Sequence, residues 1–215
     1  ARFARLYRAK VYVALNTILY DDELPEAERI AWELYRAGAD ALIVQDMSLC
    51  RLNLPPIALH ASTQCDIRTV EKVRMFESLG YEQVVLAREL SLPEIRKIAD
   101  STSVVLEAFV HGALCVSLSG QCYLSEALTG RSANRGACAQ LCRLPYTMID
   151  ADGKVIRSNQ HLLSLKDLNR SAELESMLEA GISSFKIEGR LKGISYVKNV
   201  TAHYRRLLDE LISRY

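Results

Sequence analysis

The sequence predicts an α/β protein that forms part of a (β/α)₈ TIM-type barrel, and three observations lead to this fold class. Three stretches share one order: an amphipathic helical pattern, a glycine and then a short apolar run. Most apolar runs are continuous rather than alternating, which is typical of parallel strands covered on both faces. Polar residues follow the ends of these runs, and in a barrel such positions share the rim where active sites lie.

Six apolar runs are the predicted strands, and helical patterns separate them at the spacing of βα units. Gly38, Gly80 and Gly181 each precede one of these strands, as expected of glycines that end helices in the left-handed conformation. An open doubly wound sheet is the alternative, but no G-x-G-x-x-G follows a strand, which weakens a dinucleotide-binding interpretation. The strands are expected at 11–14, 41–44, 57–60, 84–86, 104–109 and 185–187.

The chain opens on a helical pattern, "ARFARLYRAK", with no strand before it. Because a complete barrel has eight strands, we expect residues 1–215 to form a single incomplete (β/α)₈ barrel domain that lacks its first strands. The strand at 11–14 would then lack one neighbour. An exposed edge strand of this kind favours self-association with a second copy.

One segment interrupts the βα pattern before the last barrel strand. Asp152 and Gly153 lie between two short apolar runs, which is a strong signal for a β-hairpin. A helical pattern resumes over residues 164–178. We therefore expect residues 112–157 to form an inserted Cys-rich loop plus hairpin.

Composition limits the classes of function. The 27 Lys and Arg against 26 Asp and Glu give a formal net charge of +1, so any nucleic-acid-binding face must be local. No apolar run approaches the ~20 residues that span a bilayer, and the N-terminal residues do not resemble an export signal. We expect a cytoplasmic protein without membrane contact, in which a cysteine cluster binds a metal or acts in catalysis rather than forming disulfides.

Four of the six cysteines are concentrated in one segment, with the spacing Cys115-x₆-Cys122-x₁₅-Cys138-x₃-Cys142. Four thiolates suit either zinc or an iron–sulfur cluster, and a helix over 137–142 would place the last two on one face. The spacing matches neither zinc ribbons nor ferredoxins, so the alternatives stay open. They are a cluster, a structural Cys₄ zinc module, buried core cysteines, or a catalytic pair of Cys115 with His111.

Candidate catalytic residues are the polar side chains close to the predicted strand ends. His and carboxylate side chains move protons, and arginines hold a phosphate or the carboxylates of a small donor. Taken singly, each is also explained as an ordinary loop residue or strand cap. The candidates are His60, Gln64, Arg88, Glu107, His111, Glu188 and Arg190.

The stretch "EAFVHGALCVSLSGQCYLS" (residues 107–125) resembles the signature of the peptidase U32, or collagenase-like, family. The resemblance includes Glu107, Phe109, Gly112, Cys115 and Cys122. "VYVALNT" and "ALHASTQ" upstream, and "GRSANRGACAQLCRLPY" and "SFKIEGRLKGISYVKNVTAHYR" downstream, also resemble the family. The similarity therefore covers nearly the whole chain.

The resemblance implies a (β/α)₈ barrel, with this chain running from about its third strand to just beyond its eighth. Several members take part in oxygen-independent hydroxylation of transfer or ribosomal RNA, with four cysteines holding a [4Fe–4S] cluster. Those ligands correspond to Cys115, Cys122, Cys138 and Cys142. Likeness to the RNA-hydroxylation branch implies a ribosomal-RNA cytidine or a transfer-RNA wobble uridine as the target.

Two rival functions remain, a U32-type collagenase-like protease and a structural Cys₄ zinc module. A peptidase built on Cys115 and His111 leaves three cysteines unexplained, and the H-E-x-x-H of zinc peptidases is absent. RNA binding in turn needs a local basic face, for which a solvated rim of charges is the alternative explanation. The residues that would form this face are Arg131, Arg135, Arg143, Lys186, Arg190 and Lys192.

Overall fold

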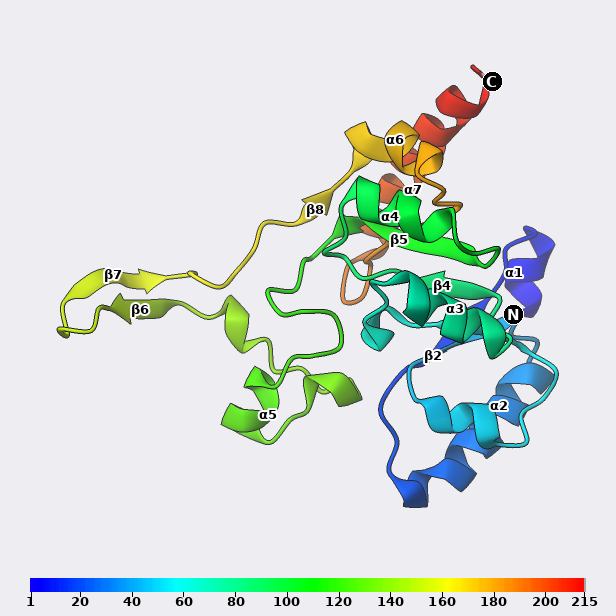
Figure 1. The fold of residues 1–215 in the computed structure, drawn as a ribbon, viewed down its shortest axis with the longest axis horizontal. Helices are drawn as coiled ribbons and strands as arrows, with labels where there is room; N and C mark the ends of the chain where they lie inside the picture. Colours follow the sequence, from blue (N-terminus) through cyan, green and yellow to red (C-terminus); the bar gives the residue numbers. More distant parts are fainter. Residues whose placement is uncertain (215) are drawn as a thin grey trace.

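The computed structural model describes residues 1–214, and its centre is a curved, mainly parallel β-sheet (Figure 1). The strand order is β1-β2-β3-β4-β5, with β8 and β9 both pairing with β5. All strand pairs in this sheet are parallel except β5 with β8 (Leu168–Asn169). The parallel strands are β1 (Tyr12–Leu15), β2 (Ala41–Val44), β3 (Ala58–Ala61), β4 (Gln83–Val85), β5 (Val105–Gly112) and β9 (Ser184–Ile187). These confirm the six predicted strands.

Helices follow the strands in the alternation expected of βα units. They are α1 (Arg2–Leu6), α2 (Leu24–Arg36), α3 (Val70–Ser78), α4 (Leu92–Ala99), α5 (Leu124–Thr129), α6 (Leu174–Glu179) and α7 (Ile194–Ile212). Local sequence sets their ends: Thr69 caps α3 through Lys72 N, and Ser91 with Glu94 forms a capping box on α4. Gly38, at a φ of +86°, follows α2 and turns the chain toward β2.

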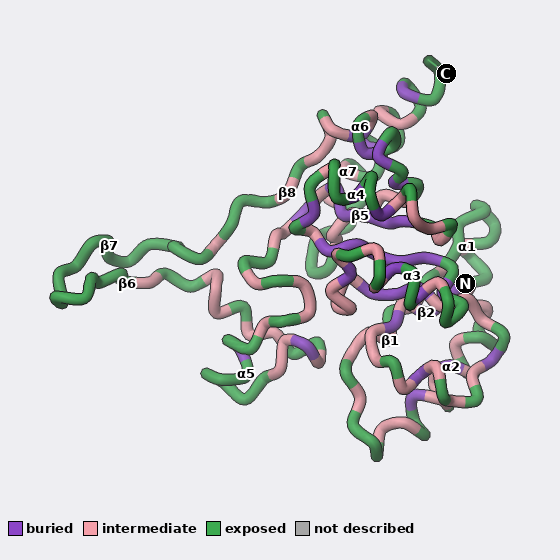
Figure 2. The backbone as a smooth tube through the Cα atoms, in the orientation of Figure 1, coloured by how far each residue is buried: buried purple, intermediate pink, exposed green. Residues whose placement is uncertain are grey.

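The two faces of the sheet differ in chemistry because side chains alternate along each strand. Leu42, Val44, Ala61, Val84 and Leu106 pack against the helices in the main hydrophobic core, which forms the buried centre of the molecule (Figure 2). The opposite, concave face carries polar residues on β3, β4, β5 and β9. The result is an α/β half-barrel in which one face supplies stability and the other is available for chemistry.

The predicted edge is present at β1, which pairs only with β2 among residues 1–214. Pairing of that edge with a second copy stays a prediction. None of the helices in the same residues is both long and apolar enough to cross a bilayer.

Between β5 and β8, the chain leaves the sheet and forms the inserted segment (Figure 1). It contains α5, two short 3₁₀ turns and the predicted hairpin of β6 (Tyr146–Ile149) with β7 (Val155–Gln160). The hairpin projects away from the body, and every residue of β7 is exposed. Its second strand extends past the predicted limit at residue 157.

The structure limits the helical pattern of residues 164–178 to its second half and does not contain the helix considered for residues 137–142. Residues 164–178 contain the short strand β8 (Leu168–Asn169) before α6 begins, because this segment pairs with the end of β5. Residues 137–142 do not form a helix, since Gln140 has a φ of +56° and only Leu141–Arg143 form a 3₁₀ turn. Cys138 and Cys142 therefore do not lie on one face of a helix.

Candidate functional site

Glu107 is the centre of the polar network on the concave face. Its carboxylate accepts hydrogen bonds from Gln83 Nε2 at 2.6 Å and Ser184 Oγ at 2.7 Å, and it pairs with Lys186 Nζ at 2.8 Å. These residues meet because β4, β5 and β9 are adjacent and in register. Both carboxylate oxygens are thus engaged, so Glu107 organises the interior of the half-barrel.

Arg88 lies at the carboxyl end of the sheet and is fixed by three contacts. Its guanidinium stacks 3.8 Å above the Phe109 ring, donates to Glu188 Oε2 at 3.2 Å and donates to Ala113 O at 3.0 Å. The Nε of Arg88 is buried and has no hydrogen-bond partner in residues 1–214. A pre-oriented guanidinium with one unused donor is suited to binding an anion or a carbonyl oxygen.

Further polar atoms on or beside this face also lack partners in the part of the chain that the structure describes. Gln45 donates through Nε2 to Gln64 O at 3.3 Å, whereas its buried Oε1 accepts nothing. The buried Nδ1 of His60 is likewise unpaired. Leaving such atoms unpaired when buried is costly, so their presence indicates a site that is completed by water or a ligand.

His60 does not share the rim with Arg88, contrary to the prediction. It lies within β3, is only 4% exposed, and packs edge-on against Tyr12 with ring centroids 4.6 Å apart. It borders a cavity of about 260 Å³ that Lys10, Asp40 and Glu82 also line. Those three residues precede their strands, so the His60 side chain faces the amino-terminal end of the half-barrel. Burial lowers its pKa, although Glu107 and Glu82 act in the opposite direction.

His111 is also not brought to the site. A β-bulge between Phe109 and His111 shifts the register against β9 and turns His111 toward α7. There its Nδ1 lies 3.3 Å from the Tyr204 hydroxyl, and its ring packs near Tyr196. Of the other predicted catalytic residues, Arg88 and Glu188 are paired at the carboxyl end. Arg190 is exposed, and its backbone N–H donates to Glu188 Oε1. Gln64 follows β3, and its carbonyl oxygen accepts from Gln45 and lies against Gly120.

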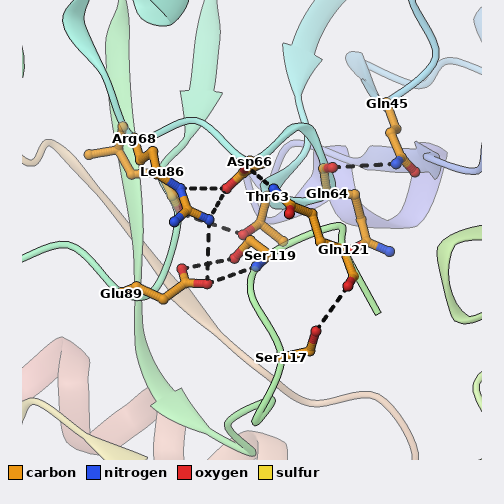
Figure 3. Close-up of polar contacts among 10 residues, drawn as sticks. All are labelled: Gln45, Thr63, Gln64, Asp66, Arg68, Leu86, Glu89, Ser117, Ser119 and Gln121. Carbon is orange, nitrogen blue, oxygen red and sulfur yellow. Dashed lines mark hydrogen bonds and ion pairs between the residues drawn. The ribbon is translucent and has the colours of Figure 1, made fainter. Parts of the chain in front are cut away.

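The Cys-rich loop docks onto the β3 and β4 loops through the contacts drawn in Figure 3. Ser119 donates to Glu89 from its backbone N at 2.7 Å and from Oγ at 3.1 Å, and Gln121 Nε2 donates to Asp66. Gly120, with a φ of +71°, lies so close to Gln64 that an added Cβ would be 2.0 Å from its carbonyl oxygen. Only glycine permits this approach.

Two arginines anchor the rest of the loop. Arg135 donates to Ile18 O, pairs with Glu23 at 2.6 Å, and stacks 4.0 Å above Tyr20, which fixes the loop to the segment after β1. Arg143 donates to Leu114 O at 2.5 Å, Ser164 Oγ at 2.8 Å and Leu165 O at 3.1 Å. The Arg135 pairing lowers the pKa of Glu23 to about 2. The loop is thus held at separated points around the carboxyl end.

These contacts change the predicted basic face. Arg135 and Arg143 hold the loop, and Lys186 points to Glu107 inside the half-barrel. Arg190 and Lys192 remain at the surface. The sequence analysis did not identify Gln83 and Ser184, which both donate hydrogen bonds to Glu107. The one signal in the sequence is that each is a polar residue directly before an apolar run.

Of the four thiols in the loop, Cys142 is affected by the other three. Burial raises the pKa of the Cys142 thiol; nearby Arg143 acts against this, and Cys115, Cys138 and Cys122 add to the rise. The backbone N–H of Gln140 donates to Cys138 Sγ at 3.4 Å. Nevertheless, residues 1–214 contain no group of three or more His, Cys, Asp or Glu side chains arranged to hold a metal ion. Cys65 differs, because burial raises its thiol pKa to about 12.

Comparison with known proteins adds sequence and structural relatives. The model of peptidase family U32 matches residues 1–215. A 23S rRNA 5-hydroxycytidine C2501 synthase of Escherichia coli K12 is 59% identical, over 98% of this chain and 32% of that protein. The tRNA hydroxylation protein P1 of Bacillus subtilis 168 is 36% identical, over 96% and 51% respectively.

A collagenase of Porphyromonas gingivalis W83 is 35% identical over 97% of this chain and 54% of that protein. The chain thus spans between a third and about half of these relatives. The solved structure of the U32 peptidase Mk0906 superposes with a TM-score of 0.54 at 15% identity, covering 89% of this chain and 74% of that one. This likeness concerns the fold.

Proposed function

This chain belongs to peptidase family U32, and from that premise we propose that it takes part in hydroxylating an RNA base, with a 23S ribosomal-RNA cytidine as the target. The observation that carries the proposal is the 59% identity, across nearly the whole chain, to a 23S rRNA 5-hydroxycytidine synthase. The lower identity of 36% to a tRNA hydroxylation protein makes a tRNA wobble uridine the second choice. A cytoplasmic location follows from an RNA substrate.

The half-barrel is, in this proposal, the larger part of a (β/α)₈ barrel whose carboxyl end is the active-site mouth. Its rim carries both kinds of hydrogen-bonding group that a nucleobase edge needs. Gln45 Oε1 is an acceptor and Arg88 Nε is a donor. Both atoms are buried and unpaired in residues 1–214, so nearby side chains must move before a base reaches them.

Cys115, Cys122, Cys138 and Cys142 are the proposed ligands of a [4Fe–4S] cluster. Thiolates are the soft donors that such a cluster requires, and the other three thiols lie near enough to Cys142 to add to the rise in its pKa. When bound, the cluster would supply electron transfer beside the base.

The remaining residues bind and orient. Replacing C–H by C–OH is a two-electron oxidation, so an oxidant must accept two electrons, and the oxygen must come from water or from a small donor molecule. Arg88 and Arg190 are placed to hold the carboxylates of a small donor of this kind. Glu188 orients Arg88 through its carboxylate and Arg190 through the backbone N–H. Glu107 and Lys186 fix the floor beneath them.

The protease alternative is not favoured. A cysteine nucleophile needs a base within hydrogen-bond reach, but His111 is turned to Tyr204 on the helix side of the sheet. No hydrogen bond joins Cys115 to a histidine in residues 1–214.

The test is mass spectrometry of ribosomal-RNA nucleosides from cells that lack the gene and from cells that carry it again. We expect 5-hydroxycytidine to disappear on deletion and to return with the wild-type gene but not with Cys138→Ala. Cys50→Ala is the matched control, because Cys50 contacts Tyr81 away from the loop, and it should restore the nucleoside. An unchanged nucleoside profile on deletion contradicts the proposal.

A further inference from the structure

The loop between β9 and α7 presents an apolar side chain in an unusual way. Leu191 has a φ of +63° and is 86% exposed, and Ile194 three residues later is 76% exposed. The left-handed conformation is strained for a residue with a Cβ, and exposure of a large apolar side chain adds no packing in return. A strained residue that contributes nothing to the fold is a candidate for function.

Resting on the proposed function, we propose that Leu191 is a wedge that enters the RNA and holds the target base out of its stack at the mouth of the half-barrel. The neighbouring charges favour RNA as the occupant. Arg190 is exposed, and its guanidinium has no partner in residues 1–214. Lys192 lies 4.0 Å from Asp167 and 5.1 Å above the Tyr196 ring. Cations on both sides of an apolar residue complement two phosphates that flank a base step.

The wedge is connected to the mouth through the chain itself. Arg190 N donates to Glu188 Oε1 at 3.2 Å, and the same carboxylate accepts from Arg88 at 3.2 Å. Glu188 N in turn donates to His111 O at 2.8 Å, which fixes the start of the loop to β5. Leu191 therefore stands on a rigid base, beside the arginine that is proposed to hold the small donor.

Hydroxylation at C5 of a cytidine requires that the base leave its stack in the RNA. The deep, narrow major groove of an RNA helix keeps protein groups from the base edge that carries C5. Enzymes that modify a base therefore take it out of the stack, and apolar side chains inserted between base steps are a known means of keeping a stack open. Leu191 matches this role in position, exposure and flanking charge.

The experiment uses a transcript of the E. coli 23S rRNA segment around C2501, with fluorescent 2-aminopurine beside that position, whose emission rises when the neighbouring base leaves the stack. Wild-type protein is expected to bind and to raise the emission. Leu191→Ala and Leu191→Gly should bind within about threefold of wild type but lose most of the rise, because phosphate contacts dominate affinity. Leu6→Ala, which alters a 77% exposed leucine in α1, is the matched control and should behave as wild type.

In Leu191→Gly, thermal stability is expected to rise while the fluorescence response to RNA binding is lost. Leu191→Gly removes the left-handed strain and should raise the Tm by about 1–4 °C, while it loses the emission rise. Arg190→Gln should weaken binding and flatten the slope of log K against log salt by about 0.7–0.9.

Three results would overturn the inference. If Leu191→Ala raises the emission as much as wild type does, the proposed role of Leu191 as a wedge is wrong, but the proposal of RNA hydroxylation is unaffected. A change in oligomeric state with Leu191→Ala, at unaltered emission, assigns the residue to a protein contact. Failure of wild type both to bind the RNA and to produce 5-hydroxycytidine in cells overturns the wedge and the proposed function together.

Discussion

Substitution of Gly120 tests whether the Cys-rich loop is held on the rim. Gly120 and Gly130 have nearly equal φ values, +71° and +70°, but different surroundings. A Cβ at Gly120 would lie 2.0 Å from the Gln64 carbonyl oxygen and 2.9 Å from its carbon, whereas a Cβ at Gly130 meets nothing within 4 Å. Gly130→Ala is therefore a matched control that carries the backbone strain without the clash.

The expected magnitudes follow from these contacts. Both alanine variants should lose ~1 kcal/mol of unfolding free energy to the left-handed conformation. Gly120→Ala must also push the loop away from Gln64, because backbone atoms cannot rotate aside. That movement disrupts the two Ser119 hydrogen bonds to Glu89 and the Gln121 contact with Asp66. Partly exposed hydrogen bonds of this kind contribute ~0.5–1.5 kcal/mol each, so we expect a further loss of about 2 kcal/mol.

Urea unfolding of the two variants and wild type, followed by circular dichroism, measures the difference directly. Gly120→Ala should also retain less iron after anaerobic purification than Gly130→Ala, because its cysteines are displaced from one another. Equal stabilities and equal iron contents for the two variants would refute the docking of the loop.

Two further predictions concern the concave face. Glu107→Gln should lower the unfolding free energy by about 2–4 kcal/mol, since Lys186 keeps a partly buried charge without its partner; a loss below ~1 kcal/mol in urea unfolding would count against the Glu107 network. The lowered pKa of His60 means that the unfolded chain binds a proton more readily, so stability is full above the unfolded pKa of about 6.5 and is lost as pH falls toward the folded pKa. His60→Gln should flatten that decline below about pH 7, as measured by urea unfolding at a series of pH values.

The parallel strands were predictable because each is a short, continuous apolar run after a helical pattern, and the hairpin because Asp152 and Gly153 separate two apolar runs. Strand β8 was not predictable, since two residues carry no periodicity and their pairing with β5 is a long-range contact. The position of His111 depends on a β-bulge, which alternation along a strand cannot reveal. His111 therefore appeared to face the site when it contacts α7.

Lys186 shows that the position of a charged side chain is equally hard to predict from the sequence. In sequence it belongs with the surface cations that follow β5 and β9, but register places it opposite Phe109, where its ammonium reaches Glu107. The unpaired atoms of Gln45 and Arg88 are likewise visible only once burial is known. Residue type identified the candidates, and the three-dimensional pairing decided which of them meet.

The most direct test of the account is the metal content of the anaerobically purified and reconstituted protein, determined with iron, sulfide and zinc assays and electron paramagnetic resonance. We expect about four iron and four sulfide per chain in a single [4Fe–4S] cluster, with the signal lost in Cys115→Ala, Cys122→Ala, Cys138→Ala and Cys142→Ala but kept in Cys50→Ala. Stoichiometric zinc without sulfide, or a full cluster signal in any one of the four single variants, would contradict it.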